Sequence, residues 1–174
     1  HPTGTGDAEL TIQGYLDDLS ATVVDGMIVC RDISVRPEKF PYLMENLQGN
    51  IELTGRGLEL KGLKARHRDV DLVINASIQN LGPNAEIDLQ RTSANMLFDS
   101  DLYHALDESA KKVWFSFKPS GKTAIDYHFN RSGDGTKEFS LMLELKKTDL
   151  VYKHFPYPLK NLTGMVLMES GHVE

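Results

Sequence analysis

The stretch "NIELTGRGLELKGLKARHRDVDLVINASIQ", residues 50–79, decides the fold of this chain. Ile51 and Leu53 alternate with polar residues in its first part. Leu58 and Leu60 resume the alternation after a break that contains glycine. A period of two is typical of a strand with one buried face, and glycine supplies the positive φ angles of a tight turn. The first part therefore predicts an antiparallel hairpin.

The second part of the stretch continues this rhythm. Val70, Leu72 and Ile74 share one face of the expected strand, while polar residues occupy most of the other face. Toward the N-terminus, "AELTIQ" alternates Leu10 and Ile12 with polar residues in the same way. Each of these segments predicts a half-buried strand.

A similar pair of strands is expected in the second half of the chain. "TAIDYHFN" at 123–130 and "EFSLMLELKK" at 138–147 both alternate, and "SGDG" at 132–135 lies between them. Gly and Asp are frequent in turns because they adopt the backbone angles that turns need. The three segments together predict a second hairpin, with Phe139 and its alternating leucines on one face.

One segment, "SDLYHALDESAKKVWFSF" at 100–117, departs from the period of two. Its apolar residues recur at spacings of three and four, which is the stripe of an amphipathic helix. Ser100 is placed to cap its start, and Pro119-Ser120-Gly121 to stop it. We predict one short helix over about 100–117. Its stripe should pack on the rest of the protein: Leu102, Leu106, Ala110, Val113 and Phe117.

The remainder of the chain predicts about eight to ten antiparallel strands. With 174 residues, the chain can bury a substantial core. We therefore expect one mostly β domain over residues 1–174, with antiparallel strands in a curled, groove-like or sandwich-like sheet and one short α-helix.

Composition and charge exclude some classes of function. The formal net charge of −6 argues against nucleic acid as a partner, because binding phosphates needs a basic face. Cys30 is the one cysteine, so we expect no disulfide framework and interpret Cys30 as a small buried apolar residue. No apolar run approaches the length that spans a bilayer. Because the sequence begins at His1 without an initiator methionine, we expect a fragment of a longer protein.

Two stretches of the chain repeat one another. "KFPYLMENLQG" at 39–49 and "HFPYPLKNLTG" at 154–164 align without a gap, 115 positions apart. Proline cannot donate to a sheet ladder, so each copy should begin a strand or lie at a sheet edge. We interpret 39–53 and 154–168 as matching starts of a structural repeat. The repeated residues are Phe40, Pro41, Tyr42, Asn46, Leu47 and Gly49 in one copy, and Phe155, Pro156, Tyr157, Asn161, Leu162 and Gly164 in the other.

The stretch "NLQGNIELTGRGLELKGLKARHRDVDLVINASIQNLG" is similar to the AsmA/TamB-type superfamily of bacterial envelope proteins, in which a Leu-x-Gly-x-Ile/Val strand and a hairpin recur. A second recurrent pattern of that family is a short helix followed by Trp, Pro-x-Gly and an alternating strand. The stretch "DSDLYHALDESAKKVWFSFKPSGKTAIDYHF" resembles this pattern. The resemblance covers about residues 8–170. It implies a long curled sheet with an apolar inner face, tethered to the inner membrane by a segment outside this chain and reaching into the periplasm. It also implies a role in lipid transport or outer-membrane biogenesis.

If the resemblance holds, the apolar faces would hold acyl chains of phospholipid or fatty acid by burial of apolar area, without covalent chemistry. Neighbouring repeats of the parent protein would be the other partners. The residues expected to face either lipid or a core are Leu10, Ile12, Ile51, Leu53, Leu58, Leu60, Val70, Leu72, Ile74, Phe139, Leu141, Leu143 and Leu145.

The titratable residues do not suggest catalysis or a cofactor. His67 lies in the charged segment "KARHRDVD", which we interpret as a solvated loop or strand end, and His128 should lie on the polar face of its strand. Asp69 and Asp71 should share one side of a strand, where paired carboxylates could act as acid and base or bind Ca²⁺. No zinc motif or P-loop accompanies them. We therefore expect no enzyme activity and no cofactor.

Two interpretations of function remain open on these grounds. The first is a non-enzymatic segment of an envelope protein that carries lipid on an apolar sheet face. The second is a closed β-sandwich that serves as a scaffold or protein-interaction module and has no lipid ligand. Alternation alone cannot separate them, because a groove wall and a core wall have the same pattern.

Overall fold

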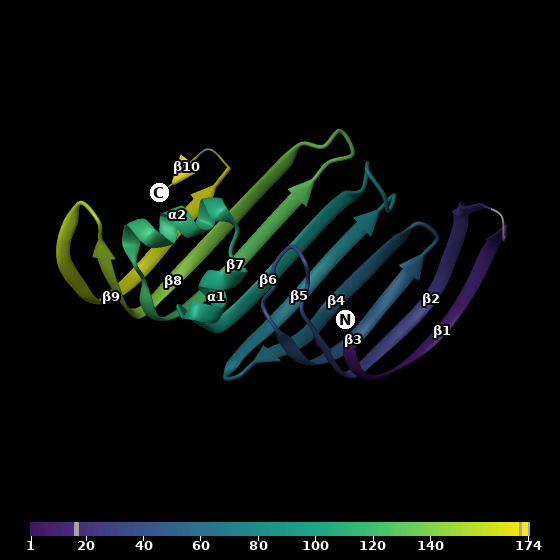
Figure 1. Cartoon of the computed structure of the whole chain (residues 1–174), viewed down its shortest axis with the longest axis horizontal. Helices are drawn as coiled ribbons and strands as arrows, with labels where there is room; N and C mark the ends of the chain where they lie inside the picture. The colour runs from purple at the N-terminus through teal and green to yellow at the C-terminus, as the bar shows by residue number, and fades with distance from the viewer. Residues whose placement is uncertain (16–17, 171, 174) are drawn as a thin grey trace.

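The computed structural model describes residues 1–15, 18–170 and 172–173. Nine long strands and one two-residue strand form a single antiparallel sheet in which sequence neighbours are also spatial neighbours. Figure 1 shows this sheet as one continuous, twisted layer with two helices near its C-terminal half. The strands are β1 (Thr3–Tyr15), β2 (Asp18–Val35), β3 (Met44–Thr54), β4 (Gly57–His67), β5 (Val70–Gln79), β6 (Glu86–Leu97), β7 (Ser120–Arg131), β8 (Lys137–Tyr152), β9 (Phe155–Glu169) and β10 (His172–Val173).

The predicted fold class, mostly β with antiparallel strands, is confirmed. All described strands belong to one open sheet, so the two packed layers of a sandwich are not the architecture of the described residues. Both predicted hairpins are present: β3 and β4 meet at Gly55-Arg56, and β7 and β8 enclose 132–136.

The pairing register places the alternating apolar residues on one face of the sheet. Residues directly opposite one another in an antiparallel pair point to the same side. Ile51, for example, is paired with Ile28 on β2 and with Leu60 on β4. A bulge at Lys61-Gly62 keeps the register, because Leu60 and then Leu63 are paired with alternate residues of β5. This apolar face runs from β1 to β9.

Part of the apolar face is covered by other segments of the chain. The segment 36–43, which joins β2 to β3, and the helices lie over the same side of the sheet (Figure 1). Tyr42 from that segment and Leu102 from the first helix belong to one buried cluster with residues of β3, β4 and β5. The core is therefore a single layer between part of the sheet and its covering segments.

The predicted single helix over 100–117 is wrong in detail, because the structure has two helices. α1 (Ser100–Ala105) is capped by Asp99 rather than Ser100, and α2 (Glu108–Phe117) by Asp107. The Asp107 carboxylate accepts a hydrogen bond from Ala110 N, which favours a fresh helix start over continuation through Leu106. The predicted packing of one continuous apolar stripe is also wrong for the second helix. α2 has no buried residue, and Val113 and Phe117 are exposed.

The two copies of the sequence repeat share their backbone geometry from the asparagine onward, whereas the Phe-Pro-Tyr part is irregular before β3 and belongs to strand β9 in the second copy. Asn46 and Asn161 have φ angles of 51° and 53°, and Gly49 and Gly164 have φ angles of 130° and 145°. The pairing of β2 with β3 and that of β8 with β9 also coincide, again 115 positions apart. The equivalent pairs are Ile28–Ile51 with Leu143–Val166, Cys30–Gly49 with Leu145–Gly164, and Ile33–Leu47 with Thr148–Leu162.

The structural repeat extends beyond the part found in the sequence. β1 and β7 begin in the same way: each starts directly after a proline, Pro2 or Pro119. The second residue of each strand is a glycine with positive φ, Gly4 or Gly121. At the other end, the Glu169–His172 and Met168–Val173 pairs of β9 and β10 match the Thr54–Gly57 and Leu53–Leu58 pairs of β3 and β4. Strands β1–β4 are thus equivalent to strands β7–β10.

Candidate functional site

Part of the apolar face of the sheet is not covered by the other described segments and is open to solvent. We call it the open apolar zone. Each of the nine long strands contributes to it, and each contributing side chain is half-buried or exposed. The zone consists of Leu10, Ile12, Val24, Leu53, Leu58, Ile78, Ile87, Phe129, Phe139, Leu141 and Met168.

Exposure of this zone is substantial for such side chains. Ile12 is 66 % exposed and Phe139 is 43 % exposed. Soluble proteins seldom expose large contiguous apolar patches unless the patch binds something. The open apolar zone is therefore the first candidate for a binding surface.

The residues expected to face lipid or a core divide into two groups. Val70, Leu72 and Ile74 are buried beneath the covering segments, so they belong to the core. The other expected residues are half-buried or exposed on the same face, with Ile51 and Leu60 packed at the edge of the core. The strand pattern could not make this division, because the covering segments come from elsewhere in the sequence.

The opposite face of the sheet is polar and contains a hollow. The hollow has a volume of about 590 Å³ and is lined by side chains that include Asp88, Gln90, Asp126 and His128. His128 Nε2 is 2.9 Å from Asp88 Oδ1, and Gln90 Nε2 donates to Asp126 Oδ1 at 3.0 Å. His128 lies on the polar face, as the strand pattern predicted. These side chains satisfy one another across neighbouring strands.

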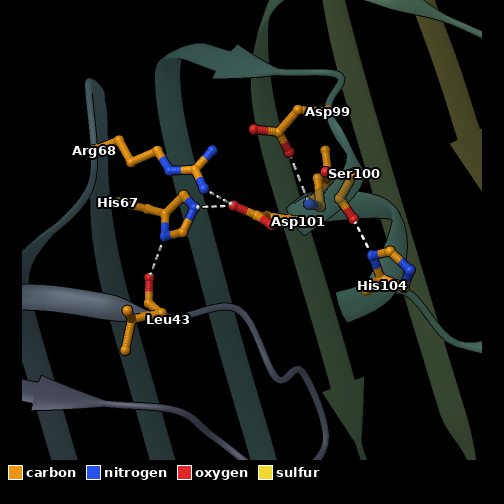
Figure 2. Close-up of polar contacts among 8 residues, drawn as sticks. Leu43, His67, Arg68, Asp99, Ser100, Asp101 and His104 are labelled. Atoms are coloured by element: carbon orange, nitrogen blue, oxygen red, sulfur yellow. Dashed lines mark hydrogen bonds and ion pairs between the residues drawn. The ribbon is translucent and has the colours of Figure 1, made fainter.

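A second candidate is the cluster around His67, at the junction of the sheet, segment 36–43 and α1 (Figure 2). His67 Nδ1 is 2.9 Å from the Leu43 carbonyl oxygen, and His67 Nε2 is 3.1 Å from Asp101 Oδ2. The Arg68 guanidinium pairs with the same Asp101 oxygen at 2.8 Å. The Tyr42 ring packs on the imidazole with 4.2 Å between centroids. These contacts tie three separate segments together.

The prediction that His67 lies in a solvated loop or strand end is wrong about solvation. His67 is the last residue of β4, but its side chain is buried. The alternation of Leu63, Ala65 and His67 carries the apolar face through to this position, and that signal could have found it. The predicted pair of Asp69 and Asp71 is also not formed as expected, because Asp69 lies in the turn and Asp71 pairs with Arg66.

Three side chains of this cluster could hold a divalent cation by geometry alone. Ligand atoms of His67, Asp99 and Asp101 lie within 4.8 Å of one another. However, Asp99 already accepts the Leu102 amide as the cap of α1, and Asp101 already faces the Arg68 cation. A positive guanidinium on the same carboxylate opposes binding of a metal ion. The arrangement fits an ion-pair clamp better than a metal centre.

Two buried polar atoms lack a hydrogen-bond partner among the described residues. They are Tyr42 Oη and Arg91 Nε. Burial, followed by the negative charges of Asp99 and Asp101, raises the pKa of the Tyr42 hydroxyl well above its ordinary value. Burial lowers the pKa of the Arg91 guanidinium. The sequence analysis missed Arg91, although its alternation with Ile87 and Leu89 is the signal that could have found it.

Comparison with known proteins does not supply a family for this geometry. Neither a protein-family model, nor a curated protein, nor a solved structure matches the chain. Within the described residues, neither helix is both long enough and apolar enough to cross a bilayer. The functional argument therefore depends on the arrangement of the chain's own residues.

Proposed function

We propose that the open apolar zone binds acyl chains of phospholipids or fatty acids, without covalent chemistry. The observation that carries this proposal is the apolar face that runs from β1 to β9, part of which no described segment covers. The binding energy would come from area removed from water, at about 0.8 kcal/mol per buried methylene group. Nine strands about 4.8 Å apart offer a width of about 40 Å, which accommodates more than one acyl chain.

The cellular setting is part of the same proposal. A sheet with one apolar and one polar face suits a periplasmic segment of a protein similar to the AsmA/TamB-type superfamily, acting in lipid transport or outer-membrane biogenesis. A membrane tether would lie outside the residues described. Support comes from the quoted sequence resemblance, the sequential strand order and the structural repeat.

Lipid binding can be tested with two neighbouring residues of β8. Leu141 belongs to the open apolar zone, whereas Met142 points to the polar face and is exposed. The chain is purified from a bacterial host, and bound lipid is measured by native mass spectrometry and by extraction. Leu141→Asp should remove most of the bound lipid, because it puts a charge where an acyl chain would lie. Met142→Asp should leave bound lipid unchanged.

Each outcome of this experiment decides something. If neither the unaltered chain nor Met142→Asp carries lipid or takes up a fluorescent fatty acid, the acyl-binding proposal fails. The open apolar zone would then be a docking face for another protein, which keeps the interaction role of the second interpretation without its closed sandwich. If both variants lose lipid equally, binding is not confined to the apolar face.

We further propose that a neighbouring repeat pairs with the free edge of β9. On β3, the equivalent edge pairs with β4 along its length. On β9, the described pairing beyond β8 is limited to Met168 and Glu169 with β10. Since the register of β9 and β10 matches that of β3 and β4, the fitting partner is an antiparallel strand with the pattern of β4.

This partner can be supplied by extending the chain. A copy of Leu60–Gln79 placed after Glu174 would continue the β4-like register, because Glu174 corresponds to Glu59. Alternate amides of β9 should then exchange with deuterium about tenfold more slowly. One glycine inserted after Glu174 is the control, since a one-residue slip turns the apolar residues to the wrong face. Equal protection by both fusions, or by neither, contradicts the proposed pairing.

A further inference from the structure

Arg91 is the one cation that the pairing register puts in the middle of the apolar face among the described strands. It is paired with Ile74 on β5 and with Tyr127 on β7. Leu89 precedes it on the same face, and Tyr127 is paired in turn with Leu141 of the open apolar zone. Arg91 therefore lies where the covered core meets the open apolar zone.

The surroundings of this guanidinium are poor in hydrogen-bond acceptors. Its Nε is buried and has no hydrogen-bond partner among the described residues. The Phe40 ring lies 4.9 Å from its central carbon, which gives a cation–π contact but no acceptor. A charged group held against an apolar surface without a counter-ion is costly, so an anion that reached it would be bound tightly.

Tyr127 adds a hydrogen-bond donor beside the cation. Its side chain is half-buried, and burial raises the pKa of its hydroxyl, so the hydroxyl keeps its proton at neutral pH. After burial, the Arg91 charge lowers the pKa of Tyr127 and the Asp107 charge raises it. The Asp107 carboxylate is engaged as the cap of α2, where it accepts the Ala110 amide at 2.8 Å.

We propose that Arg91 and Tyr127 form the subsite for the anionic head of an amphiphile whose acyl chain lies on the open apolar zone. The inference rests on the proposed function, and it specifies that the ligand has a carboxylate or phosphate at one end. The head would sit at the border of the core, beside Phe40. The chain would extend from Tyr127 toward Leu141, Phe129 and Ile87, away from the covering segments.

The test compares two probes that share one chain length. Laurate carries a carboxylate, and lauryl alcohol is uncharged. Calorimetric titration should show that the unaltered protein binds laurate about tenfold more tightly than lauryl alcohol, as expected for a charge-assisted contact. Arg91→Met keeps an unbranched apolar side chain, so it should abolish this ratio while leaving the affinity for lauryl alcohol unchanged. Arg91→Lys should keep part of the ratio.

Arg131→Met is the matched control on the same face. Its guanidinium already donates to the Ala85 and Pro83 carbonyl oxygens, so its removal should leave the preference for laurate intact. The anionic subsite would be overturned if Arg91→Met lowered the affinity for both probes equally, or left the ratio of the two affinities unchanged. Arg91 would then only pack against Phe40. Failure of the unaltered protein to bind lauryl alcohol would instead overturn the proposed function. The two failures are thus told apart by separate measurements.

Discussion

The two copies of Phe-Pro-Tyr have the same residues and the same downstream backbone, yet they occupy opposite environments. Tyr42 is 1 % exposed, whereas Tyr157 is 69 % exposed. Segment 36–43 lies over the sheet and packs on His67, while the described pairing of the equivalent part of β9 is with β8 alone. The comparison teaches that the repeated residues set the same backbone only from Asn46 and Asn161 onward, whereas Phe-Pro-Tyr is irregular in one copy and part of strand β9 in the other. Burial of each tyrosine is conferred by the residues that lie across it.

The largest expected difference between the copies is in their tyrosines. Tyr42→Ala should lower the free energy of unfolding by about 3–5 kcal/mol, because it opens a cavity in the core. Tyr157→Ala should change it by less than about 0.5 kcal/mol, as is usual for an exposed side chain. Urea denaturation of both variants measures the difference. Similar losses in the two variants would mean that Tyr157 is covered in solution, against the arrangement described here.

The glycines should differ less. Gly49 and Gly164 both have φ angles that strain an L-residue, so alanine at Gly164 should cost about 1–2 kcal/mol. At Gly49, a Cβ atom would also lie 3.0 Å from the Leu63 Cδ1 atom on β4. The cost there should rise to about 3 kcal/mol, because Leu63 must move within a packed core. Equal costs in urea denaturation would show that strand β4 does not constrain Gly49.

The clamp around His67 belongs to the first copy, and its removal should weaken that copy alone. His67→Ala removes the imidazole that bridges the Leu43 carbonyl and the Asp101 carboxylate, at a cost of about 2 kcal/mol. Because His67 and Tyr42 are in contact, the double variant with Tyr42→Ala should lose less than the two separate losses added together. Simple additivity in unfolding experiments would contradict a shared cluster.

The smallest difference between the two copies is expected at the asparagines. Asn46 and Asn161 have left-handed backbone angles that asparagine tolerates better than alanine does. Alanine at either position should therefore cost about 1 kcal/mol. The Asn161 amide also donates to Asp149, but this bond is made by the backbone and survives the substitution. Asparagine variants that differ by more than the error of the denaturation curves would refute a common backbone role.

Local sequence patterns were sufficient to predict where the strands lie and which of their residues share the apolar face of the sheet. Leu53, Leu58 and Ile78 follow a period of two, and the register puts them on the expected side. The helical segment was less predictable, because Asp107 starts a new helix in the middle of an apparently continuous stripe. A strong capping residue competes with periodicity, and periodicity alone does not reveal which of the two prevails.

The candidate sites were harder to predict. His67 and Arg91 both follow apolar alternation. His67 was interpreted as solvated because its segment is rich in charges, and Arg91 was not singled out at all. The partners of His67 come from segment 36–43 and from α1, which are distant in the sequence. Contacts of this kind depend on how the chain folds back over the sheet, which no local pattern encodes.

By itself, the sequence determined the strands, their apolar side and the repeat, because each depends on residues close together in the chain and on the period of a β-strand. Only the tertiary structure decided which part of the apolar face became core and which part stayed open to solvent. That division depends on where segment 36–43 and the two helices come to rest, and the free energy of their packing is shared among residues far apart in the sequence.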